Sequence, residues 1–443
     1  DEPSYCDALG LLEREWHEGP YGELRHDVAD DFTLDLIDGT EWNLRDNFTG
    51  CDNYVFMTDR RHRSDSNNES IWSDGVADLI ERSPPNVHYF FISERSESGT
   101  AQTMADFADL VDQDLASLSD DERSWWAGRI HLVEDHLNEV NGYVERVLEG
   151  FGYFYNFGID REQRIRNLGS FADVQRYIGG DGWPWENNLA YAAYEPRAWN
   201  FLGDRNAALA AEEDVTIVTA WTGEVLAEKV DKEVVFPDAA TLAGFDTLEI
   251  DLNMDCADPE AAEFGNCGPW DYLSHIYLLD PDGETWWELA RFITTYHREG
   301  RYLVDATPML TRLAAGGPQT LRFDISPPWN PQAYLTQMDF RFSNRGKGYR
   351  PTESTFLWGT RGFNSGYNEA REPVDVTVPE SAKRVEIWAV ITGHGMDTGE
   401  PAELSTIMSA GGLGSPSLAP QGQGAGMEGA VGCHTRIPRR PRR

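Results

Sequence analysis

The chain has 443 residues, which is too long for one ordinary domain and long enough for two or three domains, each with its own core. Hydrophobic residues make up 40% of the sequence and charged residues 26%, with 15 Trp and 17 Tyr, and this composition excludes a disordered chain. Asp and Glu number 76 against 37 Lys and Arg, so the net charge is −39, and we expect no nucleic-acid or membrane partner. Adaptation to a salty habitat is an equally good explanation of that charge.

The first segment, residues 1–180, mixes strand and helix patterns. Asp31–Gly39 alternates apolar and polar residues into a turn, and Tyr54–Met57 and His88–Ile92 are short apolar runs of the kind found in buried strands. Helical spacing occurs between these two runs, around Trp72–Ile80. Such alternation predicts an α/β domain.

Two pairs of runs in this segment resemble those of thioredoxin-like proteins. Phe32-Thr33-Leu34, Asp38-Gly39 and Asn43-Leu44 resemble the opening hairpin of redoxins, and Phe157–Asp160 with Ile165-Arg166 resembles their late hairpin. The resemblance implies a thioredoxin-like N-terminal domain. No Cys-x-x-Cys pair occurs in the sequence, so we expect a domain without redox chemistry, which counts against a thiol-dependent oxidoreductase.

Four of the five cysteines form two plausible pairs, Cys6 with Cys51 and Cys256 with Cys267, and Cys433 is left over. Paired cysteines favour an oxidising compartment, so we expect a secreted or periplasmic protein. No apolar run approaches the ~20 residues that cross a bilayer, so we also expect a soluble chain.

Residues 181–214 are rich in Gly, Trp, Asn and Ala and show no sustained period, so we predict a linker that ends at the acidic run Glu212–Asp214. Strand patterns alone follow it, which predicts an antiparallel sandwich or jelly roll over residues 215–345. The predicted strands include Val215–Val218, Lys232–Phe236, Leu248–Leu252, His275–Leu279, Trp286–Leu289 and Leu321–Ile325.

A further set of apolar runs predicts a second jelly roll that stays incomplete over residues 346–409. The set starts with Phe340–Phe342, at the end of residues 215–345, and continues with Val374–Val378 and Val385–Ile391. Residues 410–443 are rich in Gly, low in complexity and basic at their end, and we expect no packed strand there. Two explanations of this tail stay open, namely a disordered extension and translation of the second domain in a wrong reading frame.

The most specific pattern surrounds the second cysteine pair. Asp255-Cys256 is followed by a short acidic loop and by Asn266–Asp271, and a hairpin later leads to Trp286 and Arg291–Thr294. This order of elements resembles the peptide-N-glycosidase F family, bacterial amidases that remove N-linked glycans from asparagine, over somewhat less than half of the chain. The resemblance implies hydrolysis of the amide between the asparagine side chain and N-acetylglucosamine, an N-linked glycoprotein or glycopeptide substrate, and no cofactor.

The same resemblance assigns the catalytic carboxylates. Asp271 matches the catalytic aspartate of the family and Glu403 its catalytic glutamate, although the cysteines that flank that glutamate are replaced by Pro401 and Ser405. Carboxylates with tuned pKa values perform amide hydrolysis without a metal. The alternatives are a surface role for Asp271 in capping or in an ion pair, and an exposed Glu403 in a tail.

Aromatic residues beside the catalytic positions are the candidates for substrate binding. Trp270 and Trp329 are expected to offer ring faces to a sugar, and a core position is the alternative for each. Ser326 or Pro327 stands where the family has a third acid, and Tyr272 stands where it has an arginine. These departures keep open a catalytically impaired glycan- or protein-binding homologue.

No metal site is predicted from the histidines. His275, His297 and His394 are scattered along the sequence, and no carboxylate completes a His-x-x-x-His pair. We therefore expect neither a metal nor a cofactor, and the oligomeric state stays open.

Overall fold

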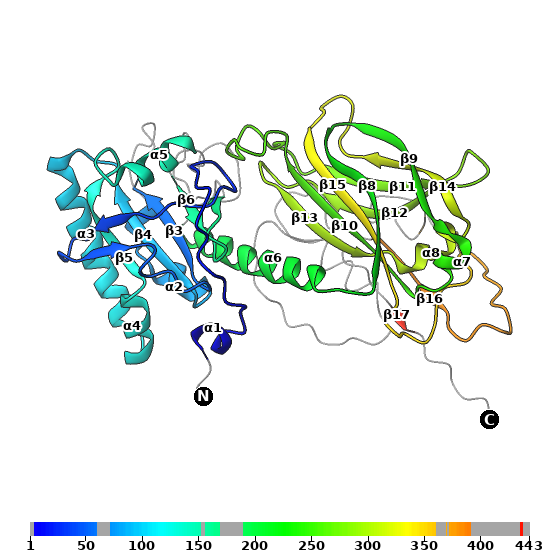
Figure 1. The fold of residues 1–443 in the computed structure, drawn as a ribbon, viewed down its shortest axis with the longest axis horizontal. Helices are drawn as coiled ribbons and strands as arrows, with labels where there is room; N and C mark the ends of the chain where they lie inside the picture. Colours follow the sequence, from blue (N-terminus) through cyan, green and yellow to red (C-terminus); the bar gives the residue numbers. More distant parts are fainter. Residues whose placement is uncertain are drawn as a thin grey trace. The chain divides into compact units, whose positions relative to one another are not determined.

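The computed structural model describes residues 4–59, 71–151, 156–168, 189–359, 369, 372–390 and 435–436. The chain divides into two compact units (Figure 1). Unit 1 contains residues 1–212 and 258–266, and unit 2 contains residues 213–257 and 267–443. The division after residue 212 falls inside the predicted linker.

Unit 1 is built on a five-stranded mixed sheet with the strand order β5-β4-β3-β6-β7. Strands β3, β4 and β5 are parallel, whereas β6 and β7 form an antiparallel hairpin that pairs with β3. Every residue of β3 and β4 is buried, as expected for parallel strands that are covered on both faces. The strands are β3 Asn53–Thr58, β4 Val87–Ser93, β5 Ile130–His136, β6 Phe157–Ile159 and β7 Ile165–Asn167.

Helices cover one face of this sheet, and a hairpin with a further helix covers the other. Val55 and Phe91 pack with α2, α3 and α6, while Phe56 and Phe90, which point the opposite way, pack with Trp42 of the hairpin and with α5. The helices are α1 Tyr5–Ala8, α2 Ala77–Arg82, α3 Glu97–Ala116, α4 Asp120–Ala127, α5 Gly142–Gly150 and α6 Tyr194–Ala210, with 3₁₀ turns at Ile71–Asp74 and Leu189–Ala193.

Both hairpins that the sequence predicted in unit 1 are present. Strand β1 Thr33–Asp35 pairs with β2 Glu41–Asn43, and β6 pairs with β7. Gly39 supplies the positive φ of +80° that the first turn needs. The buried strands expected at 54–57 and 88–92 are β3 and β4, whereas the thioredoxin-like character of the whole domain stays a prediction.

The predicted linker over residues 181–214 is wrong for its second half, because α6 occupies Tyr194–Ala210. Trp199 and Leu202 lie one helical turn apart and are buried, which stabilises the helix through packing. Pro196 lies in the first turn, where a missing N–H costs no helical hydrogen bond. The prediction failed because it relied on the Gly, Trp, Asn and Ala content of the segment and on its lack of a sustained period.

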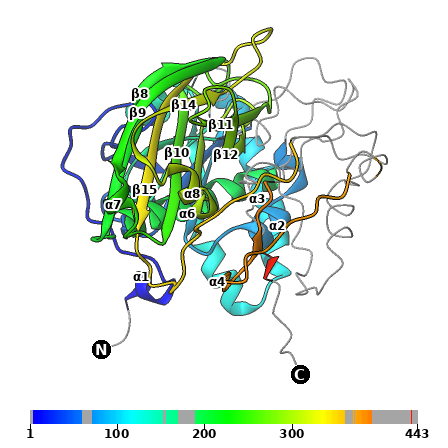
Figure 2. The same ribbon diagram turned by 90° about the vertical axis from the view of Figure 1, so that its right-hand side faces the viewer.

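Unit 2 is a sandwich of two four-stranded antiparallel sheets, seen from two sides in Figures 1 and 2. One sheet has the order β13-β10-β15-β8 and the other β12-β11-β14-β9. The strands are β8 Val215–Leu226, β9 Lys229–Asp238, β10 Thr247–Cys256, β11 Leu273–Leu279, β12 Trp286–Ile293, β13 Gly300–Asp305, β14 Gly316–Asp324 and β15 Tyr334–Ser343. Short helices α7 Ala239–Leu242 and α8 Leu310–Leu313 and a 3₁₀ turn at Thr307–Met309 lie in the connections.

The core of unit 2 lies between its two sheets. Alternate residues of β11 are buried, as expected for a strand with one face on the core, and Ile276 and Leu278 belong to the same cluster as Ile250 of β10. The rings of Phe236 in β9 and Phe340 in β15 join the sheets with a centroid distance of 5.3 Å. The predicted antiparallel sandwich is therefore present.

The assignment of Phe340–Phe342 to a second jelly roll is wrong. These residues belong to β15, which lies between β10 and β8 in the first sandwich and pairs with β10 from Tyr334 to Ser343. Strand β13 was not predicted at all. Apolar alternation identifies a strand, but it does not specify the sheet that the strand joins.

The described residues between 346 and 390 contain one strand, β16 Glu386–Ile387, and the predicted strand at Val374–Val378 is not formed. Strand β16 pairs with β17 Thr435–Arg436, so a short strand occurs in the tail where none was expected. The remainder of the predicted partial domain and of the tail lies outside the described residues.

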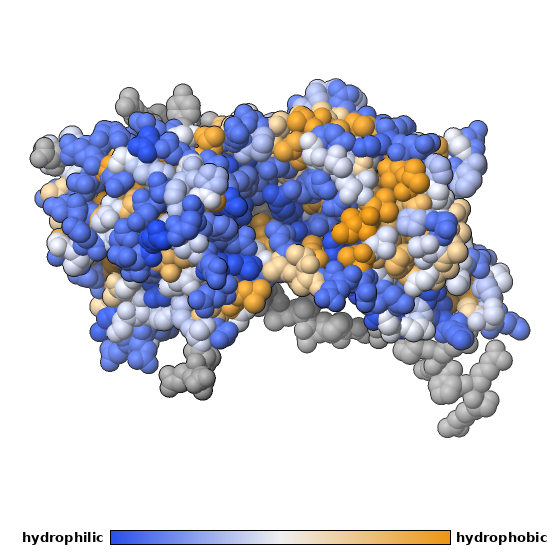
Figure 3. All heavy atoms as spheres, viewed as in Figure 1, coloured by the Kyte–Doolittle hydropathy of each residue, from blue (hydrophilic) through white to orange (hydrophobic). Residues whose placement is uncertain are grey.

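Both predicted cysteine pairs form disulfides. The Cα atoms of Cys6 and Cys51 are 5.7 Å apart, and those of Cys256 and Cys267 are 4.4 Å apart. Within the described ranges, no helix has the length and apolar character required to cross a bilayer. In the face seen in Figure 3, hydrophilic residues predominate, in line with the acidic composition.

Candidate functional site

The predicted Trp-Asp dipeptide lies in a short segment between the second disulfide and β11. Cys256 is the last residue of β10, and its bond to Cys267 fixes the start of this segment to the end of that strand. Both cysteines are buried. Asp271 is partly exposed, and β11 begins two residues later at Leu273.

Hydrogen bonds hold the backbone on both sides of Asp271. The Trp270 N–H donates to Gln332 Oε1 at 2.7 Å, and Trp270 O accepts from Gln332 Nε2 at 2.9 Å and from Thr294 Oγ1 at 2.6 Å. The Tyr272 N–H donates to Thr294 Oγ1 at 2.8 Å, and its carbonyl accepts from the Thr294 N–H at 2.9 Å. Asp271 therefore projects from a backbone that is fixed before and after it, as a catalytic carboxylate requires.

Both predicted substrate-binding tryptophans are exposed. Trp270 is 43% exposed and Trp329 is 76% exposed, so the alternative of a core position is wrong for each. Trp329 lies in the connection between β14 and β15 and contacts Tyr272 edge to face, with ring centroids 5.7 Å apart. Its neighbour Asn330 donates from Nδ2 to the Tyr272 hydroxyl at 2.6 Å.

These contacts bring two distant segments of unit 2 together. Gln332 and Tyr272 bind Trp270 and Asp271 to the connection that carries Trp329, so three of the four predicted catalytic and substrate-binding residues belong to one region. Glu403 lies outside the described residues. No pattern in the sequence pointed to Gln332, and Tyr272 was named only as a departure from the family arginine.

Ser326 has a structural role that explains one departure from the family pattern. It is 2% exposed, and its hydroxyl accepts from the Gln332 N–H at 2.9 Å and from the Glu228 N–H at 3.4 Å and donates to Gln332 O at 3.4 Å. A buried hydroxyl that is occupied by backbone groups does not replace a carboxylic acid in proton transfer.

His275 and His297, two of the three histidines for which no metal site was predicted, lie in separate environments. His275 Nδ1 lies 2.8 Å from Glu288 Oε1, and Arg291 donates two hydrogen bonds to the same carboxylate, at 2.7 and 2.8 Å. Burial raises the pKa of Glu288, but the hydrogen bonds from His275 and Arg291 lower it more, so the net pKa is below the usual value. The backbone N–H of His297 donates to Gly268 O, and His394 is not described.

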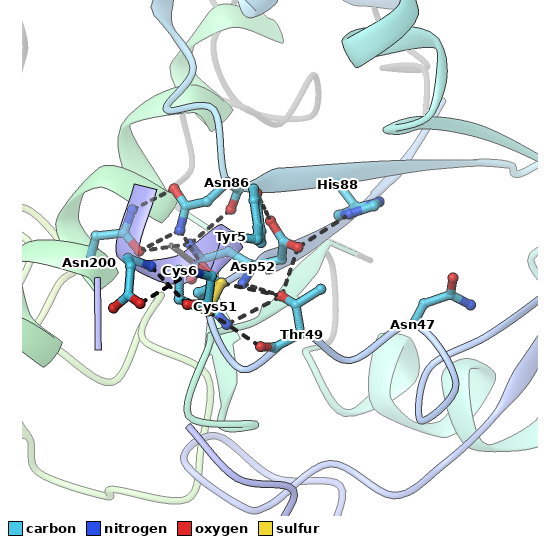
Figure 4. The surroundings of a disulfide bond; sticks show 12 residues. Tyr5, Cys6, Asn47, Thr49, Cys51, Asp52, Asn86, His88 and Asn200 are labelled. Atoms are coloured by element: carbon cyan, nitrogen blue, oxygen red, sulfur yellow. Dashed lines mark hydrogen bonds and ion pairs between the residues drawn. A yellow bond between two sulfur atoms is a disulfide. The ribbon is translucent and has the colours of Figure 1, made fainter. Parts of the chain in front are cut away.

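A second polar cluster lies in unit 1 beside the first disulfide (Figure 4). Asp52 is fully buried and accepts from the Tyr5 hydroxyl at 2.7 Å and from Thr49 Oγ1 at 2.8 Å. His88 Nε2 lies 3.8 Å from Asp52, and His88 Nδ1 lies 3.0 Å from His131 Nε2. Sequence reasoning missed this cluster, because its members lie far apart in the sequence, in α1, before β3, in β4 and in β5.

The cluster around Asp52 stabilises unit 1. Burial raises the pKa of Asp52, but the nearby His88 ring and the hydrogen bonds from Tyr5 and Thr49 keep that pKa below its usual value, so Asp52 stays ionised. Burial lowers the pKa of both histidines, that of His131 to about 3, so both are neutral near pH 7. All three side chains are buried, which gives them no direct access to a substrate.

Comparison with known proteins gives only distant likenesses. No protein-family model matches the chain, and no curated protein does. Recombinant peptide: N-glycanase F is 16% identical with a TM-score of 0.25, and the match covers 31% of this chain and 45% of that chain. PNGase F, a glycosylasparaginase from Flavobacterium meningosepticum, is 15% identical with a TM-score of 0.25 and the same coverage.

Two other solved structures are similar to parts of the chain. PNGF-II is 11% identical with a TM-score of 0.24 over 52% of this chain and 48% of that chain. The CBM36-1 domain of a multidomain xylanase from the hindgut metagenome of Trinervitermes trinervoides is 14% identical with a TM-score of 0.17, over 29% of this chain and 96% of that chain. The chain spans less than half the length of N-glycanase F, PNGase F and PNGF-II, and at these TM-scores the likeness carries no argument about function.

Proposed function

We propose that the protein is an N-glycan amidase of the peptide-N-glycosidase F type, which acts on N-linked glycoproteins or glycopeptides. One observation carries the proposal: Asp271 projects from a backbone fixed on both sides, in a region that also presents exposed Trp270 and Trp329. A carboxylate beside exposed aromatic rings suits chemistry at the bond between a sugar and a peptide.

In the proposed reaction, water attacks the carbonyl carbon of the asparagine side-chain amide. The C–N bond breaks, the peptide keeps an aspartate, and the nitrogen leaves with the sugar as a glycosylamine after it gains a proton. Asp271 removes a proton from the water or donates one to the departing nitrogen, and Glu403 is the second carboxylate. Trp270 and Trp329 bind the apolar faces of the first sugars. The proposal requires neither a metal nor a cofactor.

A glycan- or protein-binding homologue without catalysis is the second candidate. The observation that favours it is the buried hydroxyl of Ser326, because Ser326 or Pro327 stands where the resemblance implies a third acid and neither is an acid. Such a protein would keep the exposed tryptophans and bind a glycopeptide without cleaving it.

Incubation with a denatured N-glycopeptide tests the two functions, with released glycan and the new aspartate detected by mass spectrometry. We expect the wild-type chain to release glycan and Asp271→Asn to lose at least about 100-fold in rate, in the range of a lost general acid or base. Glu284→Gln is the matched control, because Glu284 is an exposed carboxylate in the β11–β12 turn and should leave the rate unchanged. Binding of the glycopeptide without release by the wild type would favour the second candidate.

A further inference from the structure

We propose that Gln332 is a positioning residue of the candidate site, whose side-chain amide fixes the Trp270–Tyr272 segment to the β14–β15 connection. Asp271 and Trp329 thereby act on one ligand. The inference about reaction rate rests on the proposed amidase function, whereas the inference about loop position does not.

The side-chain amide of Gln332 lies beside the Trp270 backbone and binds it as the backbone of an adjacent strand would. Its side chain is buried, with the residue only 3% exposed, and its amide accepts from the N–H of Trp270 and donates to the carbonyl of the same residue, 62 positions away in sequence. The amide thus pairs with both backbone groups of Trp270, as a peptide group of an adjacent strand would. Loss of the amide oxygen removes the acceptor of the Trp270 N–H, whereas loss of the amide N–H leaves the Trp270 carbonyl with the Thr294 hydroxyl as its donor.

Gly268 provides independent evidence that this position is built for the Gln332 side chain. A Cβ atom at residue 268 would lie 2.4 Å from Gln332 Cδ and 2.7 Å from both Gln332 Cβ and Nε2, so any side chain there would force Gln332 to move. Gly268 is also held in place, because its carbonyl accepts from the His297 N–H at 2.9 Å. The amide therefore fills a space that only glycine leaves open.

The other end of Gln332 closes the connection that carries Trp329. The Gln332 N–H donates to Ser326 Oγ at 2.9 Å, so these two residues form the base of a short loop. Trp329 and Asn330 lie between them and contact Tyr272 from that loop. Gln332 is consequently bonded to both segments of the candidate site.

Three substitutions separate the contributions of the amide. Gln332→Glu keeps the shape, but at pH 8 the ionised carboxylate has no donor for the Trp270 carbonyl. A protonated carboxyl group has that donor, and burial raises the pKa of a glutamate, so the contact should return near pH 5. Gln332→Met lacks both contacts at every pH, and Gly268→Ala displaces the amide without changing it.

Loop position is measured by ¹⁹F NMR of the full chain labelled with 5-fluorotryptophan, with the Trp270 and Trp329 resonances assigned from Trp270→Phe and Trp329→Phe. We expect the Trp270 resonance of Gln332→Glu to differ from wild type at pH 8 and to return at pH 5. In Gln332→Met and Gly268→Ala it should differ at both pH values. Gln319→Glu is the control, because Gln319 lies in β14 and its side-chain amide donates to the backbone oxygens of Leu313 and Gly316.

The reaction is measured in parallel as glycan release from a denatured glycopeptide, relative to wild type at the same pH. We expect Gln332→Glu to be about tenfold slower at pH 8 and to recover at pH 5, while Gln332→Met stays slow, consistent with the loss of roughly one hydrogen bond. A thermal melt of each variant at both pH values reports stability, and the rates are compared at a temperature at which every variant is folded at both pH values. A rate that falls in fully folded Gln332→Glu at pH 8 is then not a stability effect.

An unchanged Trp270 resonance in all three variants would overturn the proposal. A resonance that moves and returns, with glycan release equal to wild type at every pH, would overturn the role of Gln332 in the reaction. If the resonance behaves as expected but the wild-type chain releases no glycan, loop positioning by Gln332 stands and the proposed amidase function is wrong.

Discussion

Two buried histidines make unit 1 sensitive to acid. His88 and His131 are neutral in the folded state, with pKa values below the unfolded value of about 6.5, so the unfolded chain binds more protons once the pH falls below that value. The contribution of the neutral histidines to the free energy of unfolding is fully present above pH 6.5 and is lost progressively as the pH falls toward 3. For His131 alone the loss is about 2 kcal/mol at pH 5.

Urea unfolding of His131→Gln at pH 7.5 and pH 5 measures this contribution. We expect the denaturation midpoint of the variant to fall less between the two pH values than the wild-type midpoint does. His17→Gln serves as control, because His17 is exposed and should leave the wild-type pH dependence intact. Equal pH dependence of the midpoint in wild type and His131→Gln would show that His131 does not contribute to the pH dependence of stability.

At the same scale, Trp329 should contribute to ligand binding and not to folding, because its ring is largely exposed. Trp329→Ala removes the face offered to a sugar, and aromatic contacts are worth about 0.5–1.5 kcal/mol, so we expect two- to tenfold weaker binding of an N-linked glycopeptide. Binding is measured by isothermal titration calorimetry in variants that also carry Asp271→Asn, so that the glycopeptide is not cleaved. Trp358→Ala, at another partly exposed tryptophan, should bind as the background does.

At the scale of elements, the two disulfides are expected to have different effects on the reaction. The Cys256–Cys267 bond closes an 11-residue separation and fixes the segment that carries Asp271, whereas Cys6–Cys51 fixes α1 in unit 1. We expect Cys256→Ser with Cys267→Ser to lower the rate of glycan release at least about tenfold in folded protein. Cys6→Ser with Cys51→Ser should mainly lower the free energy of unfolding, by roughly 2–4 kcal/mol, and this appears as a lower midpoint of thermal unfolding. The opposite ranking of the two rates would contradict this assignment.

The sequence predicted individual elements better than their arrangement. Period-two alternation identified β11, and continuous apolar runs identified β3 and β4 because both faces of those strands are covered. The same signal did not distinguish a strand of the first sandwich from a strand of a second one, and β15 was misassigned for that reason. Helix α6 was missed because residues 181–214 show no sustained period, although the buried Trp199 and Leu202 stabilise the helix.

For the molecule as a whole, the net charge of −39 predicts a stability that depends on salt. Self-repulsion is screened when the Debye length falls from about 10 Å at 0.1 M salt to about 3 Å at 1 M. We therefore expect 1 M NaCl to raise the midpoint of thermal unfolding at pH 7.5, as measured by differential scanning calorimetry. Near pH 4.5, the isoelectric point of the sequence, the same addition should have little effect. An equal salt effect at the two pH values would exclude net charge as its cause.

The sequence by itself determined the strand segments with a strong apolar pattern, both cysteine pairs, and the candidate residues Trp270, Asp271 and Trp329, because each of these is encoded within a short stretch or in a simple count. Only the tertiary structure decided that Gln332 supports Trp270 and that Asp52, His88 and His131 form one buried cluster. The physical reason is that local periodicity specifies which face of a segment is buried, whereas contacts between distant residues depend on strand order and register. A buried amide or imidazole gains its role from its neighbours, and those neighbours are fixed only when the sheets assemble.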